Sequence, residues 1–108
     1  MSFASTPKPP YYVVTFASQR SDSNPEEYNA IGEKLDSLAR EQPGFLGVES
    51  TRDSSGFGIT LSYWKDRQSI INWKQNADHL VAQQLGKERF YENFTTRIAK
   101  VEREYSLK

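Results

Sequence analysis

The sequence predicts an α+β domain with the element order β-α-β-β-α-β. Four stretches are rich in β-branched and aromatic residues, as strands are. In two other stretches apolar residues recur every three or four positions, which is the spacing of a helix face. This is the order of the ferredoxin-like arrangement, in which both helices pack on one face of a four-stranded antiparallel sheet. The 108 residues have room for one such domain.

The first strand is predicted over Tyr11–Gln19, after a Pro-rich stretch, 1–10, that we expect to be a disordered leader. A helix should follow over Pro25–Gln42. Asn24 is placed to cap it, and proline suits the first helical position. Pro43 and the glycine after it should end the helix.

The second and third strands, Phe45–Arg52 and Phe57–Trp64, are predicted to form a hairpin around the turn Asp53–Gly56. Side chains of a strand alternate between the two faces of the sheet. Trp64 therefore shares a face with Thr60, and we expect a second copy of the chain to cover that face. The two sets are Phe57, Ile59, Leu61 and Tyr63 on one face, and Gly58, Thr60, Ser62 and Trp64 on the other.

Asp66 is expected to cap the second helix, whose apolar stripe consists of Ile70, Trp73, Ala77 and Leu80. A helical remainder is predicted from about Val81 to Glu92, with a break near Gly86. Within it, Gly86–Phe94 suggests a short helix whose aromatic side chains, Phe90, Tyr91 and Phe94, close one end of a pocket. The last strand is predicted over Phe94–Glu104.

Composition excludes several classes of protein. The 14 basic and 14 acidic side chains cancel, which argues against binding nucleic acid or an anionic membrane through a general positive field. The absence of cysteine excludes disulfides, thiolate metal sites and thiol nucleophiles. No stretch approaches the roughly 20 apolar residues of a membrane-spanning helix, and the first residues lack a signal-peptide core. We expect a cytoplasmic protein.

The segments QPGFLGVES and GFGITLSYWKDRQSIINWKQNADHLVAQ resemble the antibiotic biosynthesis monooxygenase domain, over about residues 11–105. Pro43-Gly44-Phe45, Tyr63-Trp64 and Trp73, nine residues after Trp64, carry the resemblance. It implies a homodimer whose two sheets face each other as an α/β barrel, with a cavity between the sheet and the helices of each subunit. Some relatives oxidise aromatic polyketides with molecular oxygen and no metal or flavin.

Other members of this superfamily bind and degrade haem. Their helix tryptophan corresponds to Trp73, but their strand asparagine has no counterpart in Val13–Phe16. Their axial histidine follows the tryptophan by nine or ten positions. Ala82 and Gln83 occupy those positions here, and His79 comes one turn too early. Haem is therefore the disfavoured cofactor, and a dimeric ligand-binding protein without catalysis stays open as another alternative.

Cofactor-independent oxygenation of a small aromatic substrate is the leading hypothesis, with His79 as the base and Arg97 stabilising the developing charge. About 240° of helix rotation separates His79 from Trp73, so a surface or rim histidine is the ordinary alternative. For Arg97 the alternative is a surface ion pair. The residues expected to bind the substrate are Trp73, Tyr63, Trp64 and Phe90. For Trp73 the alternative is an ordinary core residue.

Overall fold

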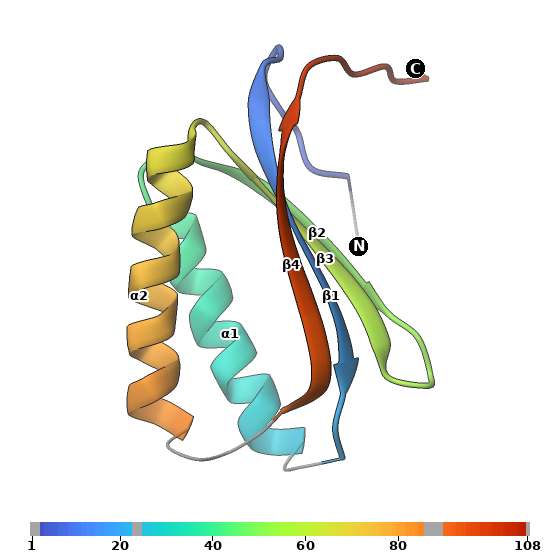
Figure 1. Ribbon diagram of the computed structural model, residues 1–108, viewed down its shortest axis with the longest axis vertical. Helices are drawn as coiled ribbons and strands as arrows, with labels where there is room; N and C mark the ends of the chain where they lie inside the picture. Colours follow the sequence, from blue (N-terminus) through green and yellow to red (C-terminus); the bar gives the residue numbers. More distant parts are fainter. Residues whose placement is uncertain (1–2, 23–24, 86–89, 108) are drawn as a thin grey trace.

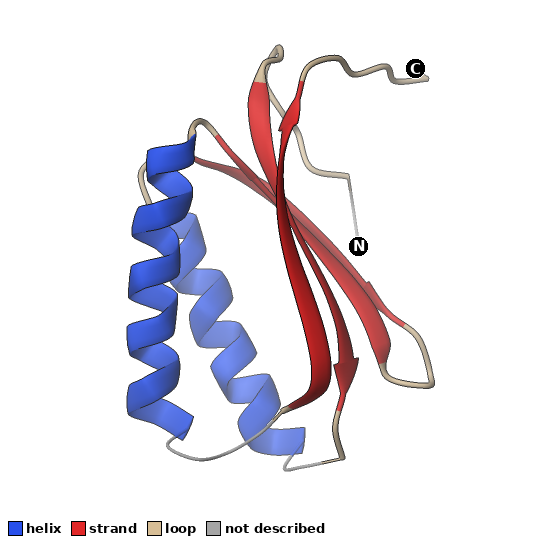
Figure 2. Cartoon of the chain, in the orientation of Figure 1, coloured by secondary structure: helices blue, strands red, loops and turns tan. Residues whose placement is uncertain are grey.

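The computed structural model describes residues 3–22, 25–85 and 90–107, with the backbone alone described at 83–85. The element order is β1 (Tyr11–Arg20), α1 (Pro25–Glu41), β2 (Phe45–Arg52), β3 (Phe57–Trp64), α2 (Arg67–Leu85) and β4 (Tyr91–Val101). The strands form one antiparallel sheet in the order β2-β3-β1-β4. Both helices lie on the same side of it (Figure 1; Figure 2), which confirms the ferredoxin-like prediction.

The hairpin bounds agree with the prediction because strong turn chemistry marks both of its ends. Gly44 has a φ of 87° after α1, and a side chain there would meet the Ser69 hydroxyl. In the turn, one carboxylate oxygen of Asp53 accepts hydrogen bonds from the backbone N–H of Ser55 at 2.9 Å and of Phe57 at 3.1 Å. A hydrogen bond from the Ser55 hydroxyl is the main cause that lowers the pKa of Asp53, and the two backbone bonds lower it further.

The region before the last strand differs from the prediction. α2 continues to Leu85, which confirms the first part of the predicted helical remainder, but β4 begins at Tyr91, so the prediction of helix at Tyr91 and Glu92 was wrong. The part of the predicted short helix at 86–89 lies outside the described residues. Aromatic side chains favour strands as well as helix faces, and pairing with the end of β1, where a bulge follows Gln19, decides for the strand here.

The helix-facing core lies at one end of the sheet. Trp64 is fully buried and forms a cluster with Ala39 and Ile70. Asp66 caps α2 as predicted, because its carboxylate accepts hydrogen bonds from the backbone N–H of Ser69 at 2.8 Å and from its hydroxyl at 2.7 Å. Partly buried side chains complete this end: Tyr12, Val14, Phe45 and Trp73.

The position of Trp64 overturns the expectation that its face is the one left open. Tyr12 is the partner of Trp64 in the register, and both face the helices. The outer face of β3 carries the other set of residues, among which Phe57 is 46% and Ile59 is 41% exposed. The alternation was correct and the choice of face was wrong, because strand periodicity alone does not say which face the helices cover.

The chain segments that flank the sheet contact its outer face. The backbone N–H of Ala4 donates to Glu49 at 3.0 Å, and the Thr6 hydroxyl donates to Glu104 at 2.9 Å. Residues 3–10 form neither helix nor strand. Among the described helices, none combines the length and apolar character that crossing a membrane requires.

Candidate functional site

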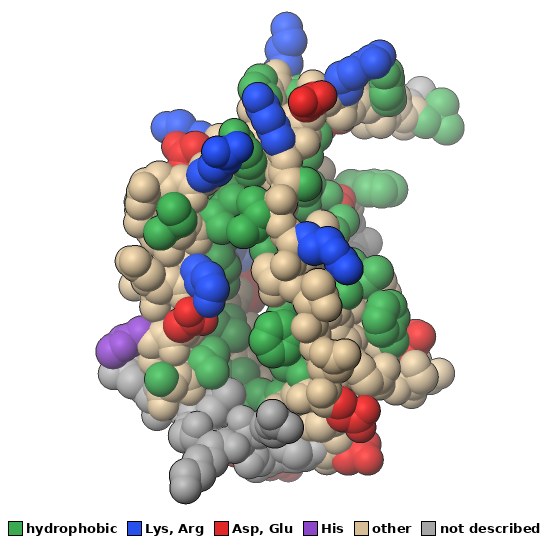
Figure 3. Space-filling model, in the orientation of Figure 1, with side chains coloured by type: hydrophobic (Ala, Val, Ile, Leu, Met, Phe, Trp, Pro, Cys, Tyr) green, Lys and Arg blue, Asp and Glu red, His purple; other side chains and the backbone are tan. Residues whose placement is uncertain are grey.

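A hollow separates the helices from the β4 side of the sheet. Register places Ile98 beside Val14 and Phe94 beside Ser18, which puts both β4 side chains on the helix-facing side. They are nevertheless 57% and 58% exposed, so the helices do not cover them. Figure 3 shows the molecule hollowed between the helix layer and β4, with hydrophobic side chains in the walls. Exposed apolar walls of this kind are typical of a ligand-binding site.

One end of the helix-facing surface is aromatic. The rings of Trp64 and Trp73 stack with centroids 5.8 Å apart and 23° between their planes. Trp64 is fully buried, and its indole N–H donates to the Ser62 hydroxyl at 2.9 Å. Trp73 is half-buried, so it alone of the pair can offer part of a ring face to a ligand. The structure thus brings together two of the predicted substrate-binding residues.

The opposite end is a cluster of tyrosine and phenylalanine rings. The Tyr91 hydroxyl donates to the Tyr28 hydroxyl at 3.3 Å, and Phe90 packs edge-on against the Tyr28 ring at 5.4 Å. Burial raises the pKa of Tyr91, and the hydrogen bond with Tyr28 raises it further. Phe90 is only 5% exposed, so this predicted binding residue supports the Tyr28 ring from behind.

Arg52 lies at the same end as this ring cluster. Its guanidinium donates to the Ser18 hydroxyl at 2.8 Å, so the side chain of a β2 residue reaches across β3 to β1. Gly58 on β3 makes the crossing possible, since a Cβ atom there would lie 2.7 Å from the Arg52 Cζ atom. The guanidinium carbon is 5.7 Å from the centre of the Tyr91 ring. A cation therefore lies on the helix-facing surface of the sheet.

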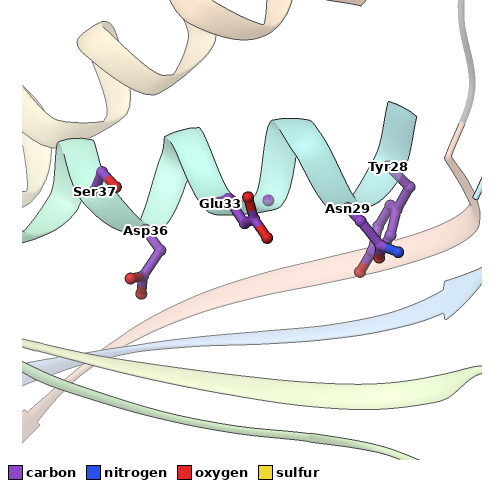
Figure 4. Close-up of a pocket in the computed structure, with 6 residues that line it drawn as sticks. Tyr28, Asn29, Glu33, Asp36 and Ser37 are labelled. Atoms are coloured by element: carbon purple, nitrogen blue, oxygen red, sulfur yellow. The ribbon is translucent and has the colours of Figure 1, made fainter. Parts of the chain in front are cut away.

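A depression of about 610 Å³ lies along the sheet side of α1 (Figure 4). In Figure 4, Tyr28, Asn29 and Asp36 point from α1 toward the strands. Gly32 leaves the middle of this wall open, because a Cβ atom there would meet nothing within 4 Å. Asp36 is paired with Arg40 at 2.8 Å. The depression is lined by Tyr28, Asn29, Gly32, Glu33, Asp36 and Ser37.

The remaining predicted site residues lie elsewhere. His79 is exposed on a continuous α2, without the kink that would turn it toward Trp73. Arg97 is exposed and pairs with Thr15 in the register, which places it on the outer face of the sheet. Tyr63 is on that outer face too, where its hydroxyl donates to Glu49 at 2.7 Å. A single chain therefore does not bring His79 and Arg97 to one site.

Sequence reasoning missed Arg52, Tyr28 and Glu33. Arg52 ends a strand and Glu33 lies on a polar helix face, which are ordinary surface positions in a sequence pattern. One signal was available: the small side chains that alternate along the third strand, Gly58, Thr60 and Ser62. Small residues on the face toward the helices leave volume that larger side chains would fill.

The model of the antibiotic biosynthesis monooxygenase family matches residues 10–85 of this sequence. The chain belongs to the antibiotic biosynthesis monooxygenase family. The uncharacterised protein YqjZ of Bacillus subtilis is 46% identical over 105 residues, which cover 96% of this chain and 91% of YqjZ. Jasmonate monooxygenase ABM of Pyricularia oryzae is 28% identical over 94 residues, which cover 83% of this chain and 43% of that protein. This chain thus spans less than half of the fungal protein.

Two solved structures share the fold of this chain. A mutant of SnoaB, a cofactor-independent oxygenase from Streptomyces nogalater, superposes with a TM-score of 0.64 at 11% identity, covering 90% of this chain and 96% of SnoaB. A dimeric ferredoxin-like protein of unknown function from Thermobifida fusca gives 0.63 at 8% identity, covering 93% and 100%. At these identities the likeness establishes the fold of this family member, and function has to be argued from its site.

Proposed function

We propose that this family member is an oxygenase of small, electron-rich aromatic compounds, which uses molecular oxygen without a bound cofactor. The observation that carries the proposal is the half-buried ring of Trp73, stacked on buried Trp64 between α2 and the sheet. A rigid ring pair offers a flat apolar surface to a flat substrate. Membership of the monooxygenase family and the fold shared with SnoaB, a cofactor-independent oxygenase, support it.

The reaction requires a substrate whose CH₂ group is acidic, as it is between two aromatic rings. A base removes a proton, and the carbanion passes an electron to dioxygen. The radical and the superoxide then combine into a peroxide, which loses water. The CH₂ group and O₂ thereby give a C=O group and H₂O, so dioxygen supplies both the oxidant and the oxygen atom. The protein has to orient the ring, exclude water and accept the proton from the CH₂ group.

We propose Glu33 as the group that accepts the proton. General-base catalysis requires geometry first and a suitable pKa second. Glu33 lines the depression on α1, and the neighbouring carboxylate of Asp36 is already paired with Arg40. His79 was the candidate from sequence, and its exposed position on α2 makes it the natural comparison.

We also propose that the outer face of the sheet is covered by a second copy of the chain. Apolar side chains continue across this face from β3 to β1, where Val13 pairs with Tyr63 and Ala17 with Ile59. Phe57 and Ile59 are partly exposed, and leaving them in water as one apolar patch is unfavourable in free energy. The dimeric ferredoxin-like protein from Thermobifida fusca shows that this fold is found in dimers.

Oxygen uptake with anthrone-type substrates in air tests the proposed reaction. The wild-type protein should consume oxygen and form the quinone, and Trp73→Ala should reduce kcat/KM at least ten-fold because the stacking surface is lost. Ile71→Ala is the matched control, since Ile71 lies on the same helix and is 50% exposed. No quinone above the uncatalysed rate, together with ligand-induced thermal shifts, would instead identify a binding protein without catalysis.

A further inference from the structure

Arg52 is a cation that neutral groups hold in place. Its guanidinium donates to the Ser18 hydroxyl at 2.8 Å, to the Ser18 carbonyl at 3.3 Å and to the Gly56 carbonyl. No carboxylate in the described part of the chain lies within salt-bridge distance of it. The side chain is half-buried, so water screens its charge only in part. A positive charge in such a position attracts an anion.

Two N–H donors of Arg52 remain for a ligand. A guanidinium has five donors, and both of those on Nη1 are used by backbone carbonyls. One donor on Nη2 is used by the Ser18 hydroxyl, which leaves the second one and the donor on Nε. These two lie on one edge of the guanidinium, in the geometry that grips both oxygens of a carboxylate. Nε is not fully buried, because no fully buried polar side-chain atom among the described residues lacks a partner.

The surroundings of Arg52 suit an aromatic acid. The Tyr91 ring lies beside the guanidinium, and Phe16 contacts Tyr91 edge-on at 5.3 Å. Phe94 packs on Phe16 at 5.4 Å and is mostly exposed, so it offers apolar surface next to the cation. The helix-facing surface runs about 20 Å from Tyr12, the β1 residue opposite Trp64, to Ser18, which is six residue steps along the strand. Aromatic side chains lie toward both ends of this length, with Trp64 and Trp73 at one and Phe16 and Phe94 near the other.

We propose that the hollow binds aromatic carboxylic acids, with the carboxylate held on the free edge of Arg52 and the ring on Phe16 and Phe94. The inference rests on the proposed function for its location, because it names the substrate class of the same hollow. It gives Arg52 a binding role, in which a bidentate ion pair orients the ring toward the end that holds Trp64 and Trp73. The Tyr28 and Tyr91 hydroxyls lie on the α1 side of this position.

Calorimetric titration with 2-naphthoic acid and with 2-naphthamide, its neutral counterpart, tests the proposal. The wild-type protein should bind the acid at least ten-fold more tightly than the amide. Arg52→Gln should abolish this preference and leave the affinity for the amide unchanged, and Arg52→Lys should keep only part of it because a lysine lacks the fork. Arg103→Gln is the matched control at an exposed position after β4.

Equal affinity for the two compounds, no binding of the acid at millimolar concentration, or a preference that survives in Arg52→Gln would each overturn the proposal. Should that variant fail to fold, the Nε–H signal of Arg52 in the NMR spectrum of the wild-type protein decides. It should move on titration with the acid and stay in place with the amide. Both measurements are of binding alone, so they stand or fall independently of whether any substrate is oxygenated.

Discussion

Tyr63 and Glu49 form a polar contact on the outer face of the sheet, next to the Tyr11 ring at 5.9 Å from that of Tyr63. Burial raises the pKa of Tyr63 above its ordinary value, and the hydrogen bond to Glu49 raises it further. The pKa of Tyr11 is raised for the same kind of reason, with Glu104 as the hydrogen-bond partner. At the residue scale, these two hydrogen bonds on the outer face form only while the hydroxyls of Tyr11 and Tyr63 keep their protons.

Alkaline pH should therefore weaken the fold. A phenol whose pKa is raised on folding contributes stability that is fully present below its unfolded value of 10.0 and is lost as the pH rises beyond it. We expect the melting temperature of the wild-type protein to fall more steeply between pH 9 and pH 11 than that of Tyr63→Phe. Tyr105→Phe, at a position that is 79% exposed, is the control and should follow the wild type. Equal slopes in all three would contradict the assignment.

Turnover should respond to Glu33 and not to His79. Glu33→Gln removes the carboxylate that lines the depression on α1 and should lower kcat about 10²-fold, a typical contribution of a general base. His79→Ala should stay within two-fold of the wild type, because His79 lies on α2 and is not among the residues that line the depression with Glu33. The reverse result, with loss of oxygen uptake in His79→Ala alone, would restore the histidine as the base.

At the element scale, α2 is positioned by its first turn. Its N-terminus is tied by the Asp66 cap, and Ile70 and Trp73 then bring one stripe onto Trp64. Farther along the helix, His79 leaves this stripe and is exposed. The start of the helix is therefore anchored to the sheet at the end where the core is densest. The hollow exists because the β4 side of the sheet is not covered in the same way, as exposed Ile98 and Phe94 show.

The cap gives a test of this anchoring. Asp66→Ala removes the acceptor of both Ser69 hydrogen bonds and should lower the melting temperature at pH 7 by several degrees. Asp66→Asn should retain most of the stability, since asparagine caps a helix about as well as aspartate. Circular dichroism at 222 nm measures both. Similar losses in the two variants would mean that the charge, rather than the cap geometry, matters.

At the scale of the whole molecule, the two faces of the sheet carry different kinds of side chain. The helix-facing side contains the tryptophan pair at one end and Arg52 at the other. The outer side contains apolar side chains, with Arg97 among them on β4. A dimer formed through the outer faces would bury Arg97 at or near the interface and leave each hollow open to a ligand.

The oligomeric state tests this division. Ile59→Lys places a charge on the outer face and should convert a dimer into a monomer, as measured by light scattering coupled to size-exclusion chromatography. Ile71→Lys is the matched control, because Ile71 is similarly exposed but lies on α2. A wild-type protein that elutes as a monomer would refute the proposed dimer, as would a dimer that persists in Ile59→Lys.

Local signals allowed much of the fold to be predicted from the sequence. Turn residues at Pro43-Gly44 and Asp53–Gly56 have strict backbone requirements, so they set the bounds of β2 and β3 wherever the rest of the chain lies. Asp66 capped α2 for the same local reason. The start of β4 could not be predicted in this way, since Tyr91 fits a helix or a strand and its pairing with Arg20 is a distant contact.

Tertiary structure alone decided the site. The alternation along β3 showed that Tyr63 and Trp64 point to opposite faces, and only the packing of α2 determined that Trp64 is the buried one. Likewise, Arg52 meets Ser18 across an intervening strand, a contact between residues 34 positions apart that no local pattern contains. Periodicity states which side chains share a face. Which face is covered, and where it stays hollow, depends on how the helices pack against the sheet.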